Sequence, residues 1–222
     1  MLTCYATLRN VTPDRRAVLG PVSVYAIREM EIEAESAQTD NAVLYPVFLD
    51  LRGRRCVVVG GGKVAGRKAR KLLQAQAVVR VISPEIDPAL ESVAAEVWRR
   101  SYEPGDLEGA SLAFAATDSR EVNAAVAGEA KERGIPVNVA DRPEEGDFAL
   151  PSTLRRGGLQ VSVSTGGASP TLAREIRGEL EEMFGPEWAG VVEELHRARR
   201  EGRETDEELE GVVRRCLSRL RG

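Results

Sequence analysis

The pattern of apolar and polar positions divides the chain into a central part with regular elements and flanking parts without a buried-sheet pattern. The apolar run at 56–59 lacks polar alternation, as is typical of a strand buried on both faces of a parallel sheet, and two further mainly apolar runs lie at 78–83 and 112–117. Charged segments with apolar residues at helical spacing separate them. Strands are predicted at 56–59, 78–83, 97–102, 112–117 and 136–140, and helices at 67–75, 88–95 and 121–133. This order predicts right-handed βαβ crossovers in a Rossmann-like α/β fold.

The pattern changes after residue 149. Residues 159–164 alternate between apolar and polar, which predicts a half-exposed strand. Ser169 and Pro170 are typical of an N-cap and a first helical position, so a helix is expected at 171–184. Its apolar face holds Leu172, Ala173, Ile176, Leu180 and Met183. This predicts a small α+β segment after the Rossmann-like part.

The two ends of the chain differ from the centre. Residues 1–44 show no persistent period and are interpreted as a poorly ordered extension, with Met30 as a possible start of translation. Residues 185–222 are charged and helical, with a break near Gly202, and lack a core of their own size. The predicted parts are 1–44 (extension), 45–149 (Rossmann-like domain), 150–184 (a small segment expected to pack on the first domain or on a second subunit) and 185–222 (C-terminal helical tail).

Composition narrows the function classes. A formal net charge of −4 and 5% aromatic residues give no electrostatic or stacking case for nucleic acid. No apolar run reaches the length of a membrane span. The three cysteines are far apart and form no CxxC pair, and His196 is the single histidine, so no metal site is expected. A soluble protein of a reducing cytoplasm fits this usage, with Cys56 buried and His196 on the surface.

A glycine turn joins the first predicted strand to the first predicted helix. Gly60-x-Gly62-x-x-Ala65 has the spacing of a dinucleotide fingerprint with alanine in the third small position. Gly60 permits the tight turn, Gly62 lets the backbone approach a pyrophosphate, and Ala65 lets the helix pack on the strand. The start of the helix would then hold the phosphates. The alternative is a purely structural turn.

Other candidate cofactor contacts follow the later strands. Pro84 and Glu85 come after the second strand, where an acid binds the ribose hydroxyls in dinucleotide folds. No arginine follows directly, which favours NAD over NADP. Thr117 and Asp118 end another strand at the same sheet edge, although Asp118 also suits a helix N-cap.

Asp141 follows the last predicted strand and is the candidate general base. Partial burial would raise the pKa of its carboxyl, and the neighbouring Arg142 would lower it. The residue type equally suits a turn before Pro143, so spacing leaves both interpretations open.

The segment 164–170 is a second glycine-rich connection from a strand to a helix. The backbone N–H groups of Thr165, Gly166 and Gly167 could form an anion site there. A plain connection is the alternative.

Taken in order, six motifs closely resemble the siroheme-synthase precorrin-2 dehydrogenase family over about residues 45–184. They are Tyr45-Pro46-Val47-Phe48-Leu49, Val59-Gly60-Gly61-Gly62-Lys63-Val64-Ala65 with Arg67-Lys68, Ala115-Ala116-Thr117-Asp118, Asn138-Val139-Ala140-Asp141-Arg142-Pro143, Phe148-x-Leu150-Pro151, and Ser164-Thr165-Gly166-Gly167-Ala168-Ser169-Pro170.

The resemblance implies NAD-dependent oxidation of precorrin-2 to sirohydrochlorin, and in some members ferrous iron insertion. It implies that residues 45–149 form an NAD-binding domain and that residues 150–184 form a dimerisation segment, which is exchanged between the subunits of a homodimer. The family's essential aspartate falls on Asp141, and its cofactor contacts fall on Lys63, Val64, Pro84 and Glu85. A serine important in part of the family falls on Thr165, which leaves the role of this residue open.

The implied substrate carries eight carboxylates and therefore requires cations and backbone donors. The candidates are Arg142, Arg155, Arg156, Arg174 and the turn Thr165-Gly166-Gly167. In iron insertion the macrocycle itself would bind the metal.

Two other functions remain open at this point. A non-catalytic NAD-sensing module would share the glycine turn but would not need Asp141 or the segment 164–170. An ordinary small-substrate dehydrogenase is disfavoured because no histidine or lysine lies beside the predicted site.

Overall fold

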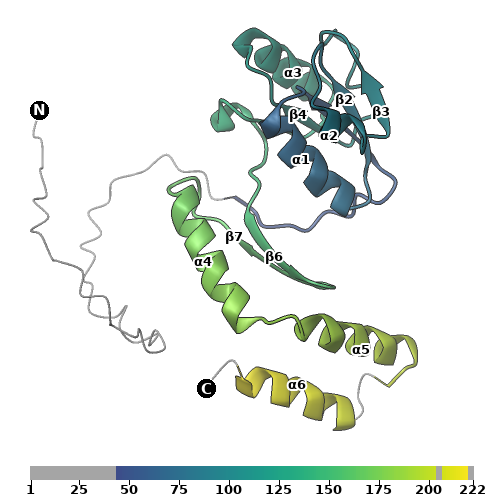
Figure 1. Cartoon of the computed structure of the whole chain (residues 1–222), viewed down its shortest axis with the longest axis vertical. Helices are drawn as coiled ribbons and strands as arrows, with labels where there is room; N and C mark the ends of the chain where they lie inside the picture. Colours follow the sequence, from purple (N-terminus) through teal and green to yellow (C-terminus); the bar gives the residue numbers. More distant parts are fainter. Residues whose placement is uncertain (1–43, 204–206, 220–222) are drawn as a thin grey trace, which may run out of the picture. The chain divides into compact units, whose positions relative to one another are not determined.

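The central part of the chain is a five-stranded parallel sheet. The structure, a computed structural model, describes residues 44–203 and 207–219. The strands are β1 (Arg55–Val59), β2 (Val78–Ile82), β3 (Glu96–Trp98), β4 (Leu112–Ala115) and β5 (Val137–Val139). They lie in the order β3-β2-β1-β4-β5. Figure 1 labels β2, β3 and β4 of this sheet. All four neighbouring pairs are parallel, so the predicted Rossmann-like fold is confirmed.

Three helices connect these strands and cover both faces of the sheet: α1 (Lys63–Gln74), α2 (Pro88–Glu91) and α3 (Arg120–Glu132). Cys56 and Val58 pack in the apolar cluster that includes α1, whereas Val57 and Val59 pack in the cluster that includes α3. Successive residues of a strand point to opposite faces, so a run with both faces covered is apolar throughout. This explains why β1 lacks polar alternation in the sequence.

Several predicted boundaries were wrong. Helix α1 begins at Lys63 rather than at residue 67, because the glycine turn leads directly into its first turn. Helix α2 covers Pro88–Glu91 instead of 88–95, since the Ala95 N–H already donates to Val79 O and the chain joins the sheet there. Strand β3 covers Glu96–Trp98 instead of 97–102, because the chain turns after it with the Arg100 N–H donating to Trp98 O, and it forms one edge of the sheet.

A separate two-stranded antiparallel sheet follows, built from β6 (Ser152–Arg156) and β7 (Leu159–Val163). The residues of β7 alternate between partly buried and exposed, which confirms the predicted half-exposed strand. Helix α4 (Pro170–Met183) packs on both strands. Its N-cap is Ser169, whose Oγ accepts a hydrogen bond from the Leu172 N–H at 3.1 Å, as the sequence predicted.

The C-terminal part contains α5 (Trp188–Arg200) and α6 (Glu207–Arg219), with Gly202 at φ +71° between them. The break therefore lies where it was predicted. The predictions for residues 1–43, including Met30 and Cys4, lie outside the described residues. Within the described ranges, no helix combines the length and the apolar character that crossing a membrane requires.

Candidate functional site

The ends of four parallel strands bring most of the predicted site residues to one sheet edge. In the register of the sheet, Val59 pairs with Ile82 and Ala115, and Ala115 pairs with Val139. The four strands therefore end level with one another. The segments that follow them carry Gly60, Pro84 with Glu85, Thr117 and Asp141. This edge of an open parallel sheet is where ligands bind in such folds.

Two glycines of the turn are required by close backbone contacts. Gly60 has φ +123°, and a Cβ there would lie 2.3 Å from Ala116 O. A Cβ at Gly61 would lie 1.8 Å from Glu85 O, and the Asp87 N–H donates to Gly61 O at 2.9 Å. The fingerprint spacing by itself assigns no role to Gly61. Its neighbour Glu85 is near in space but 24 positions away in the chain, so no local signal pointed to it.

Gly62 differs from these two glycines because the space around it is open. No atom lies within 4 Å of the position that a Cβ would occupy. Gly62 is the N-cap of α1 and supplies no side-chain hydrogen bond to the first turn. Lys63 and Val64 follow and are exposed. The first N–H groups of α1 are thus accessible to an anion, which favours a dinucleotide phosphate at this position.

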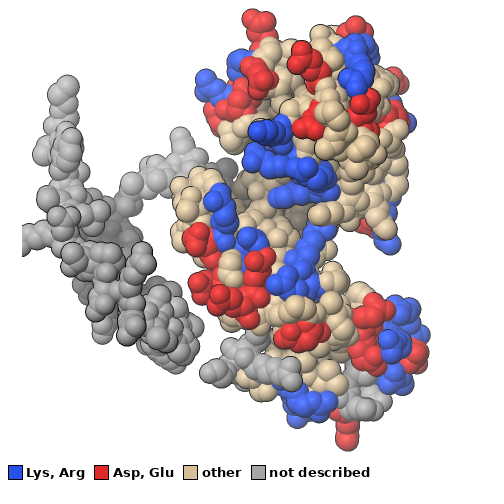
Figure 2. Space-filling model, in the orientation of Figure 1, with Lys and Arg blue, Asp and Glu red and all other residues tan. Residues whose placement is uncertain are grey.

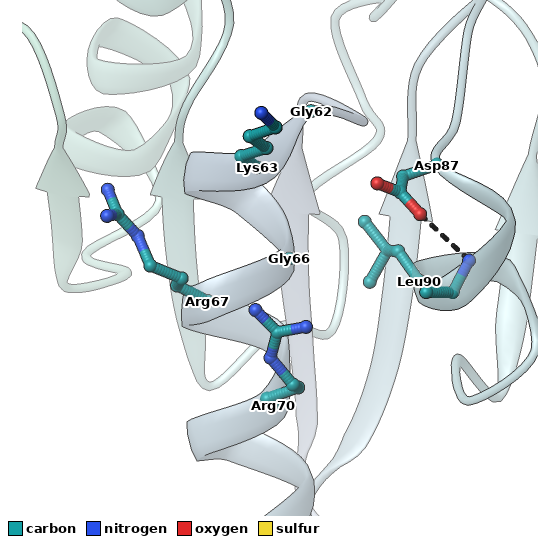
Figure 3. A pocket seen from close by; sticks show the side chains of 8 residues that line it. Gly62, Lys63, Gly66, Arg67, Arg70, Asp87 and Leu90 are labelled. Atoms are coloured by element: carbon teal, nitrogen blue, oxygen red, sulfur yellow. Dashed lines mark hydrogen bonds between the residues drawn. The ribbon is translucent and has the colours of Figure 1, made fainter.

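A cavity of about 280 Å³ begins at this turn and extends between α1 and α2 (Figure 3). Its charged lining residues are Lys63, Arg67, Arg70 and Asp87. Asp87 caps α2 by accepting a hydrogen bond from the Ala89 N–H at 2.8 Å. The acid that lines the cavity is therefore Asp87, whereas the sequence predicts Glu85. Lys and Arg side chains also gather on the surface over α1 (Figure 2).

Asp141 is held by three kinds of donor after β5. The Asn123 Nδ2 donates to its Oδ1 at 2.8 Å, and the Arg120 Nη1 lies 3.3 Å from its Oδ2. Partial burial acts to raise the pKa of this carboxyl. Its own backbone N–H, the Asn123 amide and the Arg120 guanidinium outweigh burial and lower the pKa below its usual value. Asp141 is therefore ionised at neutral pH and able to accept a proton.

The cation beside Asp141 is not the one expected from the sequence. Arg142 pairs with Glu144 at 3.3 Å, whereas the guanidinium in contact with Asp141 belongs to Arg120. Arg120 also pairs with Glu145. The adjacent Arg142 is the partner that the sequence predicts, but Arg120 is brought to Asp141 by the crossover from β4 to β5.

Thr117 and Asn123 form a second contact that the sequence analysis did not foresee. The Thr117 N–H donates to Asn123 Oδ1 at 3.1 Å, and the Thr117 hydroxyl lies 2.8 Å from the same oxygen. The helix N-cap is Ser119, whose Oγ accepts from the Val122 N–H at 3.3 Å, so the N-cap interpretation of Asp118 was wrong. Asparagine is unfavourable on the buried face of a helix. Its presence there is the sequence feature that could have identified Asn123.

The segment before Asp141 has a structural contact of its own. Asn138 accepts a hydrogen bond from Lys68 Nζ at 2.5 Å and donates from Nδ2 to Phe148 O at 2.8 Å. Lys68 Nζ also lies 5.6 Å from the centroid of the Phe114 ring. Burial, followed by the charges of Lys71 and Arg67, lowers the pKa of Lys68. These contacts attach the segment around Phe148 to the sheet.

The second glycine-rich segment forms a compact local turn. Gly166 and Gly167 have φ +60° and +89°. The Thr165 Oγ1 donates to Ser169 O and accepts from the Ser169 N–H, both at 3.1 Å. The Gly166 N–H already donates to Ser164 Oγ at 3.3 Å. In the part of the chain that the structure describes, no hydrogen bond or ion pair joins this turn to Asp141.

The arginines expected to bind carboxylates differ in their surroundings. Arg156 donates from Nε to Phe184 O at 2.8 Å, so it satisfies a carbonyl just beyond the end of α4. Arg155 and Arg174 are exposed. Burial lowers the pKa of Lys71, and the charges of Arg155 and Arg67 lower it further. Across residues 44–203 and 207–219, no three His, Cys, Asp or Glu side chains are grouped as metal ligands.

Two family models match consecutive parts of the chain. One, described as putative NAD(P)-binding, matches residues 47–152. The other, described as sirohaem biosynthesis protein central, matches residues 156–183. Together they cover more than half of the chain, and the border between them lies within β6.

Similar proteins carry related names. The chain is 49% identical over 143 residues to the siroheme synthase of Methylobacillus flagellatus and 48% identical over 144 residues to that of Chromobacterium violaceum. Each alignment covers 63% of this chain and 31% of the relative, so the chain spans about a third of these proteins.

A solved structure, of SirC, precorrin-2 dehydrogenase, has a TM-score of 0.63 and 26% identity. That alignment covers 80% of this chain and 99% of SirC. These comparisons agree with one another and with the site geometry. The chain belongs to the family of siroheme synthases and precorrin-2 dehydrogenases.

Proposed function

We propose that this chain oxidises precorrin-2 to sirohydrochlorin, with NAD as the hydride acceptor, in the formation of siroheme. The observation that carries the proposal is the position of the Asp141 carboxylate, hydrogen-bonded by Asn123, at the same sheet edge as the open N-terminus of α1. The reaction removes a hydride and a proton from the substrate, so it requires a dinucleotide site and a proton acceptor side by side.

The residues of the glycine turn fit a nicotinamide dinucleotide. Gly60 and Gly61 allow a turn that any Cβ would block, and Gly62 leaves the helix start open. Lys63 and Val64 supply N–H groups of the first turn. Pro84 and Glu85 are proposed as further contacts, since the Glu85 backbone lies against Gly61. NAD, when bound, supplies the hydride-accepting ring. Thr117 is a further candidate contact at the crevice.

The choice of NAD over NADP rests on the acids near the end of β2. Glu85 and Asp87 are suited to ribose hydroxyls, whereas a 2′-phosphate would be repelled. Arg67 and Arg70 line the same cavity, and their positive charges would favour the 2′-phosphate of NADP. Measured dissociation constants for NADH and NADPH test this choice, and we expect tighter binding of NADH.

Asp141 is the proposed general base. Its lowered pKa keeps it charged, and about a third of its side chain is exposed, with a relative accessibility of 36%. It can therefore reach a proton on a bound macrocycle. Exposed cations and backbone donors would hold the substrate carboxylates, and the candidates are Arg142, Arg155, Arg174 and the turn Thr165–Gly167.

We further propose a homodimer in which the segment 150–184 is exchanged between subunits. Three large apolar side chains of α4 support it: Leu172 is 52% exposed, Ile176 38% and Met183 49%.

Cys56 and Cys216 are free thiols, which suits a reducing cytoplasm. Ferrous iron is proposed only as a second substrate, and its insertion is tested separately by adding it to the finished reaction.

The test compares the wild type with Asp141→Asn under anaerobic conditions, with precorrin-2 and NAD. We expect the variant to lose turnover by about 100-fold or more, as is typical when a general base is removed. Its affinity for NADH should stay unchanged. Glu121→Gln is the matched control because it removes an exposed carboxylate from the start of α3, next to Arg120 in the chain.

A wild type that binds NADH but never forms sirohydrochlorin would refute the enzyme proposal and favour an NAD-sensing module. Equal turnover in wild type and Asp141→Asn would leave the reaction standing but would remove Asp141 from its role.

A further inference from the structure

We infer that Asn123 is a positioning residue that fixes the orientation and the charge of the Asp141 carboxylate. The inference rests on the proposed function, in which Asp141 accepts the proton. Asn123 lies in α3, 18 positions before Asp141, and is 1% exposed. A buried amide requires partners, because an unsatisfied polar group in the core destabilises the fold.

The side chain of Asn123 finds these partners only at the site. Its Nδ2 donates to Asp141 Oδ1 at 2.8 Å and to Thr117 O at 3.0 Å. Its Oδ1 accepts from the Thr117 N–H at 3.1 Å. One amide therefore connects the segment after β4 with the residue that follows β5.

The partners determine which way the amide points. With the amide reversed, its oxygen would face two acceptors, the Thr117 carbonyl and the Asp141 carboxylate, and its NH₂ would face the Thr117 N–H. Only the observed orientation gives each of these groups a complementary partner. The Thr117 backbone thus fixes Asn123 so that its NH₂ group donates to Asp141.

Asn123 is a better candidate for this role than Arg120. The Arg120 guanidinium is 41% exposed, lies 3.3 Å from Asp141 Oδ2 and is shared with Glu145. The Asn123 bond to Asp141 is shorter and comes from a buried group. A long, exposed side chain adopts many conformations, and fixing it in one of them costs entropy. We therefore assign orientation to Asn123 and a supporting charge to Arg120.

The variant Asn123→Asp separates positioning from folding. It has nearly the same shape and still accepts from the Thr117 N–H, but it replaces the donor to Asp141 with a second carboxylate. The charged groups facing Asp141 are then the carboxylate introduced by the substitution, the Arg120 guanidinium and, through Arg120, Glu145. Two adjacent carboxylates raise the pKa of one of them, so we expect the Asp141 titration to move upward by about one pH unit.

The measurement is the titration of the Asp141 carboxyl by NMR in the ligand-free full chain, with selectively ¹³C-labelled aspartate and with Asp141→Asn to identify the signal. Turnover is followed in parallel over the same pH range. We expect the acidic limb of the rate profile to move with the titration and kcat to fall about tenfold at neutral pH, with NADH affinity unchanged.

Asn138→Asp is the matched control, because it makes the same change in another buried asparagine, 7% exposed, that contacts Lys68 and Phe148 O instead. Asn123→Ala provides a second variant that removes the donor without adding a charge, and it should raise the titration by a smaller amount.

An Asp141 titration that stays in place in both Asn123 variants would overturn the inference, and so would an equal movement in Asn138→Asp. A wild type without precorrin-2 oxidation but with the expected titration shift would refute the proposed function alone. The two failures are therefore distinguishable.

Discussion

At the scale of single residues, the adjacent glycines Gly61 and Gly62 have different roles that the sequence pattern does not distinguish. Gly61 exists for packing, because a Cβ would overlap Glu85 O at 1.8 Å. Gly62 has open space and a φ of −87°, which any residue can adopt. The first glycine is therefore required by the protein itself, whereas the second leaves room for a ligand.

Alanine substitutions at these two positions should affect different properties, stability at Gly61 and cofactor binding at Gly62. Gly61→Ala should lower the free energy of unfolding by about 3 kcal/mol or more, because backbone atoms must move. Gly62→Ala should cost no more than about 1 kcal/mol, since glycine is the better N-cap, but should weaken NADH binding. Denaturant unfolding and NADH titration measure both quantities. Normal stability in Gly61→Ala would contradict the packing role.

The thiol of Cys56 should be inert in the folded protein. It is 0% exposed, and burial raises its pKa to about 11. Little thiolate then exists at a pH of about 8. Alkylation followed by peptide mass analysis should modify the partly exposed Cys216 and leave Cys56 unmodified until the protein unfolds. Rapid native labelling of Cys56 in Cys216→Ser would contradict the burial of β1.

At the scale of elements, α4 shows an apolar stripe that the described part of the chain leaves exposed. Ala173 packs toward the small sheet and is 7% exposed, while Leu172, Ile176 and Met183 remain at least 38% exposed. Their spacings of four and seven residues place them on one face of the helix. Such a stripe is typical of an interface between subunits.

A charge in this stripe should separate the proposed dimer. Ile176→Asp should convert a dimer into a monomer in sedimentation experiments, because an unpaired carboxylate would be buried at the interface. Thr171→Asp, on the same helix but outside the stripe, is the control and should remain dimeric. A wild type that sediments as a monomer would refute the homodimer.

At the scale of the whole molecule, two buried carboxylates tie the loop between β3 and β4 to its surroundings. Asp106 accepts from Arg100 Nη2 at 2.7 Å and from the Glu103 N–H at 2.8 Å. Glu129 of α3 accepts from the Gly105 N–H at 2.9 Å and from Tyr102. Burial acts to raise both pKa values, but these hydrogen bonds outweigh it and lower them.

These lowered pKa values predict acid destabilisation. A carboxyl with a lower pKa in the folded state stabilises the fold above its unfolded pKa, about 4, and this contribution is lost as the pH falls below that value. Thermal unfolding should therefore show little change between about pH 7 and pH 5 and a clear loss of stability at about pH 3.5.

Asp106→Asn is the informative variant for this effect. It should lower stability at neutral pH by about 1–3 kcal/mol, because a charged hydrogen-bonded acceptor is lost, and should show a shallower decline in acid. A wild type that is as stable in acid as at neutral pH would contradict the role of the two carboxylates.

The sequence by itself determined the layout of the fold. Local patterns suffice for this, because a buried strand must be apolar and a turn with φ +123° requires glycine. The same local chemistry identified Ser169 as a cap and Asp141 as a residue after a strand. The order of six motifs then indicated the family.

The tertiary structure alone decided which residues meet at the site. Arg120 and Asn123 reach Asp141 across 21 and 18 positions, and Gly61 meets Glu85 across 24. These contacts depend on the register of parallel strands and on the path of a crossover helix. A local sequence pattern reflects the packing of one element and does not show which residues of other elements lie beside it. For this reason the sequence predicts the adjacent Arg142, and not Arg120, as the cation beside Asp141.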